Sequence, residues 1–335
     1  MIRRGTPFNA MITGIAHYLP ERRLTNADLE QMVETTDEWI RTRTGISERR
    51  ILEKGKGTSV MAIEAAKRLM EQTGLTAEEI DLIIVGTVTP DMYFPSTACL
   101  VQDAIGAKNA WGFDVLGACC GFIYTLTVGA QFIETGAHKK VVVIGADKMS
   151  SIMDYTDRQT CVLFGDAAGA VLLEPTTDPE MGILDFIHHI DGSGGQYLYM
   201  PGGGSLHPPT HETVEKKMHY VHQDGQAVFK FAVVGMAEVS EDLLKQNGLT
   251  GSDIALFVPH QANLRIIESS AKRMKLDPSK VAITIDKYGN TTSGTIPVSL
   301  SEAVDEGLVK KGDLIVMSSF GAGFTWGSVL TRWGY

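Results

Sequence analysis

The order of short apolar runs and helical stretches repeats along this 335-residue chain, and the repeat is what most limits its fold. Runs rich in β-branched residues alternate with stretches of helical period, which is typical of an α/β protein with buried strands. Three predicted strands of the second half start 172, 170 and 173 residues after their counterparts (81 to 253, 111 to 281, 140 to 313). So constant an offset predicts a duplicated α/β unit. Since any α/β protein alternates in this way, an unduplicated domain stays the alternative.

Each half is predicted to contain four strands and two helices. In the first half the strands are 81–88, 111–115, 140–146 and 167–173, and the helices are 96–105 and 120–135. In the second half the strands are 253–258, 281–285, 313–319 and 325–331, and the helices are 262–275 and 293–306. The last strands are offset by only 158 residues (167 to 325), because the first half has an extra loop near 148–159. The polar, proline-broken segment 174–181 separates two predicted halves, 1–175 and 176–335.

Composition excludes several classes of protein. The chain has 30 Lys and Arg against 40 Asp and Glu, a net charge of −10, which disfavours nucleic acid as a partner. No apolar run reaches the roughly 18 residues of a membrane span, and the polar residues 1–11 do not resemble a signal peptide. The four cysteines form no C-x-x-C pair, and so long a chain needs no disulfides. We therefore expect a cytoplasmic protein with free thiols and no metal site.

Cys119 is the first candidate catalytic residue. The strand 111–115 ends in small residues, and Cys119 stands where the next helix begins. The positive end of the helix dipole and the free N–H groups there are expected to lower the pKa of its thiol and make it a nucleophile. A buried structural cysteine is the alternative, and Cys120 is expected only to pack inside the helix layer.

The second half places further polar residues at turns between a strand and a helix. His260 follows the strand 253–258, at the edge where open α/β folds build their sites, although a structural histidine is the alternative. Under the repeat, Asn290 occupies the same turn as Cys119, where an asparagine can also be only a helix N-cap. Residues 319–324 (SFGAGF) suit a loop whose backbone N–H groups bind an oxyanion. The convergence of Cys, His and Asn from two related halves predicts a catalytic site.

The motifs that carry these residues resemble β-ketoacyl-acyl carrier protein synthase III. They are 35–46 (TTDEWIRTRTGI), 114–122 (DVLGACCGF), 259–265 (PHQANLR), 288–291 (YGNT) and 321–327 (GAGFTWG). The resemblance runs from about Met11 to the C-terminus. It implies an α/β, thiolase-like fold, in which two pseudo-symmetric halves pack as a five-layered αβαβα sandwich. The asparagine at position 290 resembles the third catalytic residue of the initiating class. The elongating enzymes instead have a Cys-His-His set, and the degradative thiolases use a second cysteine.

The resemblance implies a decarboxylative condensation that initiates fatty-acid biosynthesis. An acyl-coenzyme A primer, acetyl or another short or branched chain, would react with malonyl-acyl carrier protein to give 3-oxoacyl-acyl carrier protein, coenzyme A and CO2. Cys119 would carry the acyl group, and the backbone N–H groups of Cys119 and Ala322 would hold its oxyanion. His260 and Asn290 would donate hydrogen bonds to the malonyl thioester oxygen. Coenzyme A and the phosphopantetheine of the carrier protein are substrates in this scheme, and no cofactor is implied.

The same resemblance implies binding residues and a homodimer. Those for coenzyme A are Thr35, Trp39, Arg43, Arg158 and Asn263, with the adenine held between Trp39 and Arg158. Those for the acyl carrier protein are Gln261, Ala262, Asn263, Leu264, Arg265, Lys230 and Lys272. Phe94 would close the acyl pocket of the partner subunit, and Phe320 would line the same tunnel. On the predicted helix 262–275, Arg265 and Lys272 are seven residues apart and share one face, which a solvated surface would also show.

Other functions are compatible with parts of this pattern. A condensing enzyme of specialised metabolism or an acyl-thioester hydrolase would use the same fold and Cys119. A thiolase-fold acyl-coenzyme A binding protein, or a redox sensor that uses Cys119 and Cys120, would need neither His260 nor Asn290. The Gly- and Pro-rich segment 191–213 is predicted to be a functional or interfacial loop.

Overall fold

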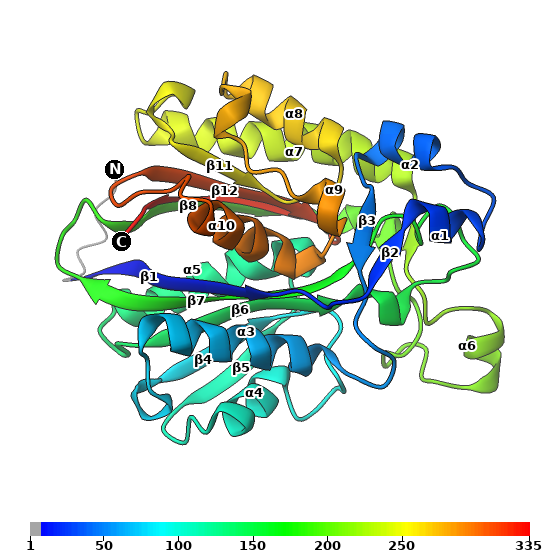
Figure 1. Ribbon diagram of the computed structural model, residues 1–335, viewed down its shortest axis with the longest axis horizontal. Helices are drawn as coiled ribbons and strands as arrows, with labels where there is room; N and C mark the ends of the chain where they lie inside the picture. Colours follow the sequence, from blue (N-terminus) through cyan, green and yellow to red (C-terminus); the bar gives the residue numbers. More distant parts are fainter. Residues whose placement is uncertain (1–7) are drawn as a thin grey trace.

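Five alternating layers of helices and sheets make up the computed structural model, which describes residues 8–335 (Figure 1). The predicted αβαβα sandwich is confirmed. Residues 1–7 lie outside the described residues. They are the start of the predicted first half and most of the polar N-terminal segment 1–11. Within that described part, no helix has the length and apolar character needed to cross a membrane.

The first sheet has five strands in the order β1-β7-β6-β4-β5. These are β1 (Asn9–Tyr18), β4 (Leu82–Gly86), β5 (Trp111–Val115), β6 (Val141–Lys148) and β7 (Asp166–Thr176). β4 lies between two parallel neighbours and is buried along its whole length, as a strand covered on both faces must be. The outer face is covered by α3 (Thr58–Thr73) and α4 (Thr97–Ile105).

The second sheet repeats this arrangement with the order β11-β12-β13-β8. Its strands are β8 (Gly182–Ile190), β11 (Leu256–Pro259), β12 (Leu314–Gly321) and β13 (Thr325–Arg332). β12 pairs in parallel with β11 and antiparallel with β13, as β6 does with β4 and β7. The outer helices are α7 (Gly225–Gln246) and α8 (Leu264–Arg273). The sheet order therefore supports the duplication that the sequence spacing indicated.

The predicted strand 281–285 is wrong. Only Val281 bridges to Phe257, and the chain then turns into the short helix α9 (Ile285–Tyr288). The buried Gln261 side chain occupies the backbone groups that a strand would use. Its amide nitrogen donates to the Ala282 carbonyl at 3.1 Å, and its oxygen accepts from the N–H groups of residues 284 and 285 at 3.0 and 3.1 Å.

The middle layer consists of α5 (Gly121–Glu134) and α10 (Thr295–Asp305), which lie between the two sheets (Figure 1). A helix covered on both sides must be apolar nearly all round. α5 accordingly buries Phe122, Ile123, Leu126, Ala130 and Ile133. Each of these two helices begins at one of the predicted catalytic turns, so the middle layer positions the site.

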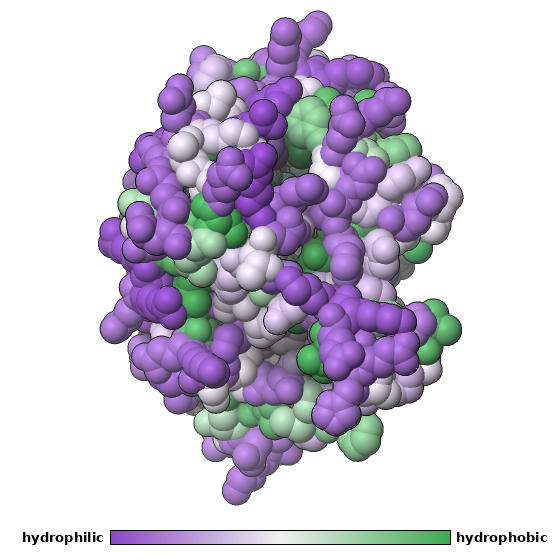
Figure 2. Space-filling view, turned by 90° about the vertical axis from the view of Figure 1, so that its right-hand side faces the viewer, coloured by the Kyte–Doolittle hydropathy of each residue, from purple (hydrophilic) through white to green (hydrophobic). Residues whose placement is uncertain are grey.

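Two excursions flank the sandwich near the start of the middle helices. One is a small cap formed by β2 (Arg23–Thr25), α1 (Asn26–Glu30), α2 (Asp37–Thr44) and β3 (Glu48–Arg50). The other runs from β9 (Leu198–Tyr199) through α6 (His211–Glu215) to β10 (His222–Gln223), with β9 and β10 paired. The molecular face over α1, α2 and α6 is mostly hydrophilic, with small separate apolar areas (Figure 2). The cap is joined to the core by buried Arg49, which donates to the Val162 carbonyl at 2.6 Å.

Candidate active site

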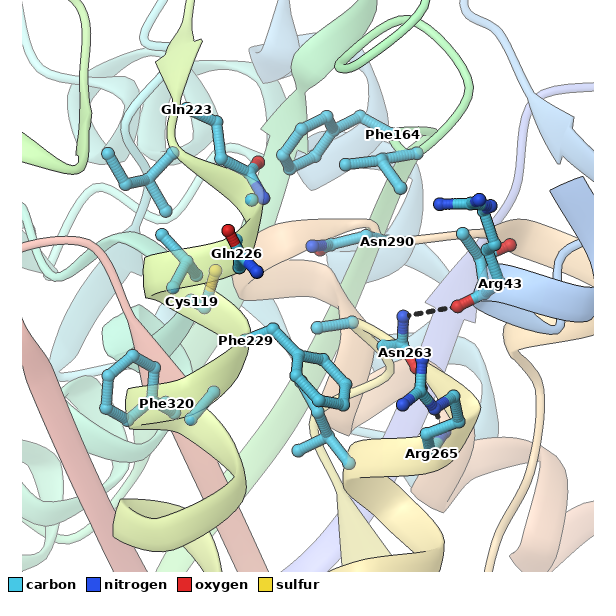
Figure 3. Close-up of a pocket in the computed structure, with 18 of the residues that line it drawn as sticks. Arg43, Cys119, Phe164, Gln223, Gln226, Phe229, Asn263, Arg265, Asn290 and Phe320 are labelled. Carbon is cyan, nitrogen blue, oxygen red and sulfur yellow. Dashed lines mark hydrogen bonds between the residues drawn. The ribbon is translucent and has the colours of Figure 1, made fainter. Parts of the chain in front are cut away.

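A cavity of about 730 Å³ opens between the two halves and contains the three predicted catalytic residues. Cys119, His260 and Asn290 all contribute to its wall, and Figure 3 shows the Cys119 sulfur and the Asn290 amide directed into it. Cys119 comes from the first half, and the other two come from the second. The structure therefore brings together residues that are up to 171 positions apart in the sequence.

Cys119 lies in a tight turn between β5 and α5. The turn is a short 3-10 segment, Ala118–Cys120, and the first residue of α5 follows it directly. Ala118 has a φ of 45°, a conformation that costs free energy for any residue other than glycine. The Cys119 side chain is only 6% exposed, and Cys120 is fully buried in the helix layer as expected.

The expected lowering of the Cys119 pKa is wrong. Burial raises the pKa of the thiol well above its usual value, and the nearby Cys120 and Asp147 raise it further. The backbone N–H groups of Cys119 and Ala322 act in the opposite direction by hydrogen bonding to the sulfur, but they do not offset the loss of solvent. The resting residue is thus a neutral thiol next to the two N–H groups that were predicted as oxyanion donors.

His260 lies at the end of β11 and is 2% exposed. Burial lowers its pKa to about 3, so the imidazole is neutral at physiological pH and carries one N–H. Neither ring nitrogen has a hydrogen-bond partner among residues 8–335. A buried and unpaired donor is costly, and it is typical of a group kept for a substrate.

Asn290 serves both of the roles that the sequence suggested for its position. Its side-chain oxygen accepts from the Thr292 N–H at 2.9 Å and caps the following turn. This bond identifies the oxygen and leaves the NH2 group directed into the cavity, where no described residue accepts from it. His260 and Asn290 therefore present two N–H donors on the same cavity as the Cys119 sulfur.

Three of the residues predicted to bind coenzyme A, Trp39, Arg43 and Asn263, line the outer end of this cavity, and Arg158 lies beside them without lining it. The Arg43 and Arg158 guanidinium groups lie 4.7 and 5.2 Å from the Trp39 ring centroid. Because Arg158 already contacts the ring, an adenine can enter between them only if one of the two side chains moves. Asn263 caps α8 and also donates to the Arg43 carbonyl at 2.8 Å (Figure 3). Thr35 does not line the cavity, and its hydroxyl is buried without a partner among the described residues.

Only some of the residues predicted to bind the acyl carrier protein are exposed to solvent. Arg265, Lys272 and Lys230 are exposed, and none of them forms an ion pair with a described residue. Gln261 is a wrong prediction for this surface, because it is fully buried and both of its polar groups bind the backbone. Ala262 lines the cavity and Leu264 is half-buried at the start of α8.

The two predicted acyl-pocket residues lie in different surroundings. Phe320 is buried in the cavity wall, with its ring centroid 5.0 Å from that of Phe324. Phe94 is 85% exposed and does not line the cavity of its own chain. Phe94 therefore does not contribute to the cavity of its own chain, and its predicted place in the pocket of a partner subunit stays a prediction.

The sequence analysis missed several residues on the opposite wall. Gln223, Gln226 and Phe229 extend into the cavity from β10 and the start of α7, and Phe164 faces them (Figure 3). Asp224 gave a usable signal, because its side chain accepts from two N–H groups as an N-cap of α7. Recognising that N-cap would have predicted the start of α7 at Gly225.

Comparisons with known proteins agree with this geometry. The family model described as 3-oxoacyl-[acyl-carrier-protein (ACP)] synthase III matches residues 113–192, and the model of the same family's C-terminal part matches residues 244–333. A relative from Koribacter versatilis, named beta-ketoacyl-[acyl-carrier-protein] synthase III, is 58% identical across 97% of this chain and 98% of its own length. A relative of the same name from Chlorobium luteolum is 57% identical across 97% of this chain and 99% of its own.

The chain belongs to the β-ketoacyl-acyl carrier protein synthase III family. Solved structures place it in the same fold. The enzyme of that name from Aquifex aeolicus has a TM-score of 0.90 and 44% identity, over 97% of this chain and 100% of that one. A priming β-ketosynthase from the R1128 polyketide pathway has a TM-score of 0.91 and 33% identity, over 99% and 98% of the two chains.

The neutral state of His260 predicts a pH dependence of stability. The unfolded chain binds a proton at this histidine below pH 6.5, but the folded chain binds it only near pH 3, so its contribution to stability is lost as the pH falls below 6.5. When the pH falls from 7 to 5, the free energy of unfolding should decrease in both proteins. The decrease should be about 2 kcal/mol smaller for His260→Gln than for the parent chain, because the variant lacks this histidine. Urea unfolding at both pH values measures this, with exposed His222→Gln as control. Equal losses in parent and His260→Gln would contradict a neutral, buried His260.

Proposed function

We propose that this chain condenses an acyl-coenzyme A primer with malonyl-acyl carrier protein to form 3-oxoacyl-acyl carrier protein, coenzyme A and CO2. One observation carries the proposal. A buried thiol flanked by two backbone N–H groups shares one cavity with the unpaired donors of His260 and Asn290. Such a set suits acyl transfer to sulfur followed by stabilisation of an enolate.

In the first half-reaction, the Cys119 sulfur loses its proton and attacks the thioester carbonyl of acyl-coenzyme A. The backbone N–H groups of Cys119 and Ala322 stabilise the oxyanion, and each such donor typically contributes about 3 kcal/mol to the transition state. The bond to the coenzyme A sulfur breaks, and coenzyme A leaves as a thiol with the proton. The acyl group is then held on Cys119 as a thioester.

In the second half-reaction, malonyl-acyl carrier protein occupies the same cavity. The His260 N–H and the Asn290 NH2 donate to its thioester oxygen. The electron pair of the bond to the carboxylate moves into the enolate as CO2 leaves. The enolate carbon attacks the acyl-Cys119 carbonyl, and the carbon–sulfur bond breaks. The Cys119 thiolate that is released takes up one proton from solvent and becomes the thiol again. No electron acceptor is needed, because the condensation involves no net oxidation or reduction.

The two substrates are proposed to enter from the same side. Trp39, Arg43, Arg158, Asn263 and Thr35 lie at or near the outer end of the cavity and are proposed to hold coenzyme A. Arginine is suited to stacking and to phosphate contacts. Arg265, Lys230 and Lys272 are proposed to attract the acidic carrier protein. Substrates of this kind and four free cysteines fit a protein of the cytoplasm.

We favour fatty-acid synthesis over specialised metabolism as the pathway. The relatives at 58% and 57% identity carry the name of the fatty-acid enzyme, whereas the R1128 priming ketosynthase is 33% identical. Both enzymes would use the same chemistry at Cys119. The difference lies in which primer the tunnel accepts.

We also propose a homodimer that forms along the free edge of β5. That strand is the last of its sheet, and its other edge has no partner strand among the described residues. Three large apolar side chains on or near β5 are exposed, namely Trp111, Leu116 and Phe94. A second copy would cover this surface and would place Phe94 where it can reach the partner's acyl pocket.

The condensation is tested with purified chain, acetyl-coenzyme A and malonyl-acyl carrier protein. We expect one 3-oxoacyl-acyl carrier protein and one CO2 for each coenzyme A released. Cys119→Ser should lower product formation by roughly a thousandfold or more, and Cys99→Ser at an exposed site should leave it unchanged. Release of free acid in place of the 3-oxo product would instead support a thioester hydrolase. Binding of acyl-coenzyme A without turnover would support a binding protein.

Reversal of charge at Lys272 tests the carrier-protein surface. Lys272→Glu should raise the KM for malonyl-acyl carrier protein several-fold, and less so at high salt, while acylation of Cys119 by acyl-coenzyme A is unchanged. Lys310→Glu, an exposed lysine beyond the end of α10, is the matched control. An equal loss in both half-reactions would contradict the assignment of this surface.

The dimer is tested at the exposed end of β5. Leu116→Asp places a charge on the proposed interface and should convert the dimer into a monomer in analytical ultracentrifugation. Leu308→Asp, at an exposed leucine after α10, should leave the sedimentation coefficient unchanged. A monomeric parent chain, or a Leu116→Asp variant that stays dimeric, would refute this interface.

A further inference from the structure

Each of the two catalytic turns is held by the central strand of the opposite half. The Ser319 hydroxyl, on β12 of the second half, donates to the Cys119 carbonyl at 2.8 Å. Conversely, the Asp147 carboxylate, on β6 of the first half, accepts from the Ser293 N–H at 3.0 Å, three residues after Asn290. β6 and β12 are counterparts in the duplicated unit, so the two bonds form a reciprocal pair.

Asp147 is fully buried, and its two oxygens accept five hydrogen bonds. One oxygen binds the segment after β4 through the Thr87 and Thr89 hydroxyls and the N–H groups of Val88 and Thr89, at 2.8 to 3.1 Å. The other oxygen binds Ser293. Burial raises the pKa of this carboxyl to about 6, which shows that the ionised form is costly to bury here. A carboxylate is nevertheless suited to this place, because it accepts from five donors and an amide would turn its own N–H groups toward some of them.

Three glycines of the first half leave room for Ser293 to lie against the start of α5. A Cβ atom at Gly145 would lie 2.3 Å from the Ser293 carbonyl oxygen. Cβ atoms at Gly121 and Gly86 would lie 2.7 and 2.8 Å from the Ser293 hydroxyl oxygen. No larger residue fits there without displacement, so the Asn290 turn is located by close contact as well as by the Asp147 bond.

Both catalytic turns contain backbone that needs such support. Ala118, directly before Cys119, has a φ of 45°, and Thr292, two residues after Asn290, has a φ of 52°. Each conformation is unfavourable for a residue with a side chain and persists only when the surroundings impose it. The surroundings in both turns include a hydrogen bond from the opposite half.

We propose that Asp147 and Ser319 are positioning residues, each of which sets the catalytic turn of the opposite half. Asp147 orients the Asn290 donor, and Ser319 orients the Cys119 turn and its N–H. The inference rests on the proposed condensation. It adds that the two half-reactions depend on two separate cross-half bonds, so they can be impaired one at a time.

The test measures the half-reactions separately in purified full-length chain. Acylation is followed by intact mass after mixing with acetyl-coenzyme A alone. Decarboxylation is followed as labelled CO2 released from malonyl-acyl carrier protein alone, which leaves acetyl-acyl carrier protein after uptake of a proton. Asp147→Asn should slow decarboxylation by roughly ten- to a hundredfold. It should not slow acylation, because loss of the Asp147 charge removes one of the causes that raise the pKa of the Cys119 thiol. Ser319→Ala should show the opposite preference.

A double variant separates positioning from general damage. If Asp147 acts through Asn290, Asp147→Asn should add no further loss of decarboxylation to Asn290→Ala. Asp81→Asn is the control, since the Asp81 carboxylate also accepts from backbone N–H groups, those of Lys139 and Lys140, but within its own half and away from both catalytic turns. Its effects on the two half-reactions should be equal. Additive losses in the double variant would overturn the positioning role.

A second variant covers the case in which Asp147→Asn does not fold. Gly145→Ala pushes on the Ser293 carbonyl and should reproduce the selective loss of decarboxylation. Gly129→Ala presses on Val143 and Leu173 of the same core but not on Ser293, and is its control. Equal loss of both half-reactions in folded Gly145→Ala, or no loss, overturns the inference. A parent chain that neither acylates nor decarboxylates would instead refute the proposed function.

Discussion

The contact on which the structure most depends is the approach of the Asn290 turn to the first turn of α5. Glycines at positions 86, 121 and 145 allow this approach, and the Asp147 carboxylate ties it together. Because α5 and α10 lie between the sheets, this contact also determines how the two halves meet. Cys119, His260 and Asn290 share one cavity as a consequence.

Loss of solvent determines the chemical state of the site. Burial keeps the Cys119 thiol protonated by raising its pKa, and it keeps His260 neutral by lowering its pKa to about 3. A site of neutral groups with unpaired N–H donors is ready to stabilise negative charge that develops on a substrate oxygen. The same burial makes unpaired donors costly to maintain.

The layers and most of the site could be predicted from the sequence because they depend on local pattern. Apolar runs located the strands β4 to β7 and β11 to β13, and Cys119 and His260 were recognised at the turns that follow two of these strands. β1, β8, α3 and α7 were missed, and the strand at 281–285 was wrong because the Gln261 side chain replaces its ladder. The Cys119 pKa and the Asp147–Ser293 bond could not be predicted either. Both depend on burial and on contacts between residues more than a hundred positions apart, which no local spacing encodes.

The central claim is that Cys119 becomes a covalent acyl carrier in this buried site. The most direct measurement is intact mass after brief mixing with a panel of acyl-coenzyme A thioesters, with the modified residue mapped in peptides. The account predicts one acyl group per chain, located on Cys119, and the fastest acyl chain identifies the primer. A folded chain that gains no adduct from any thioester, or an adduct on another residue, would contradict the account.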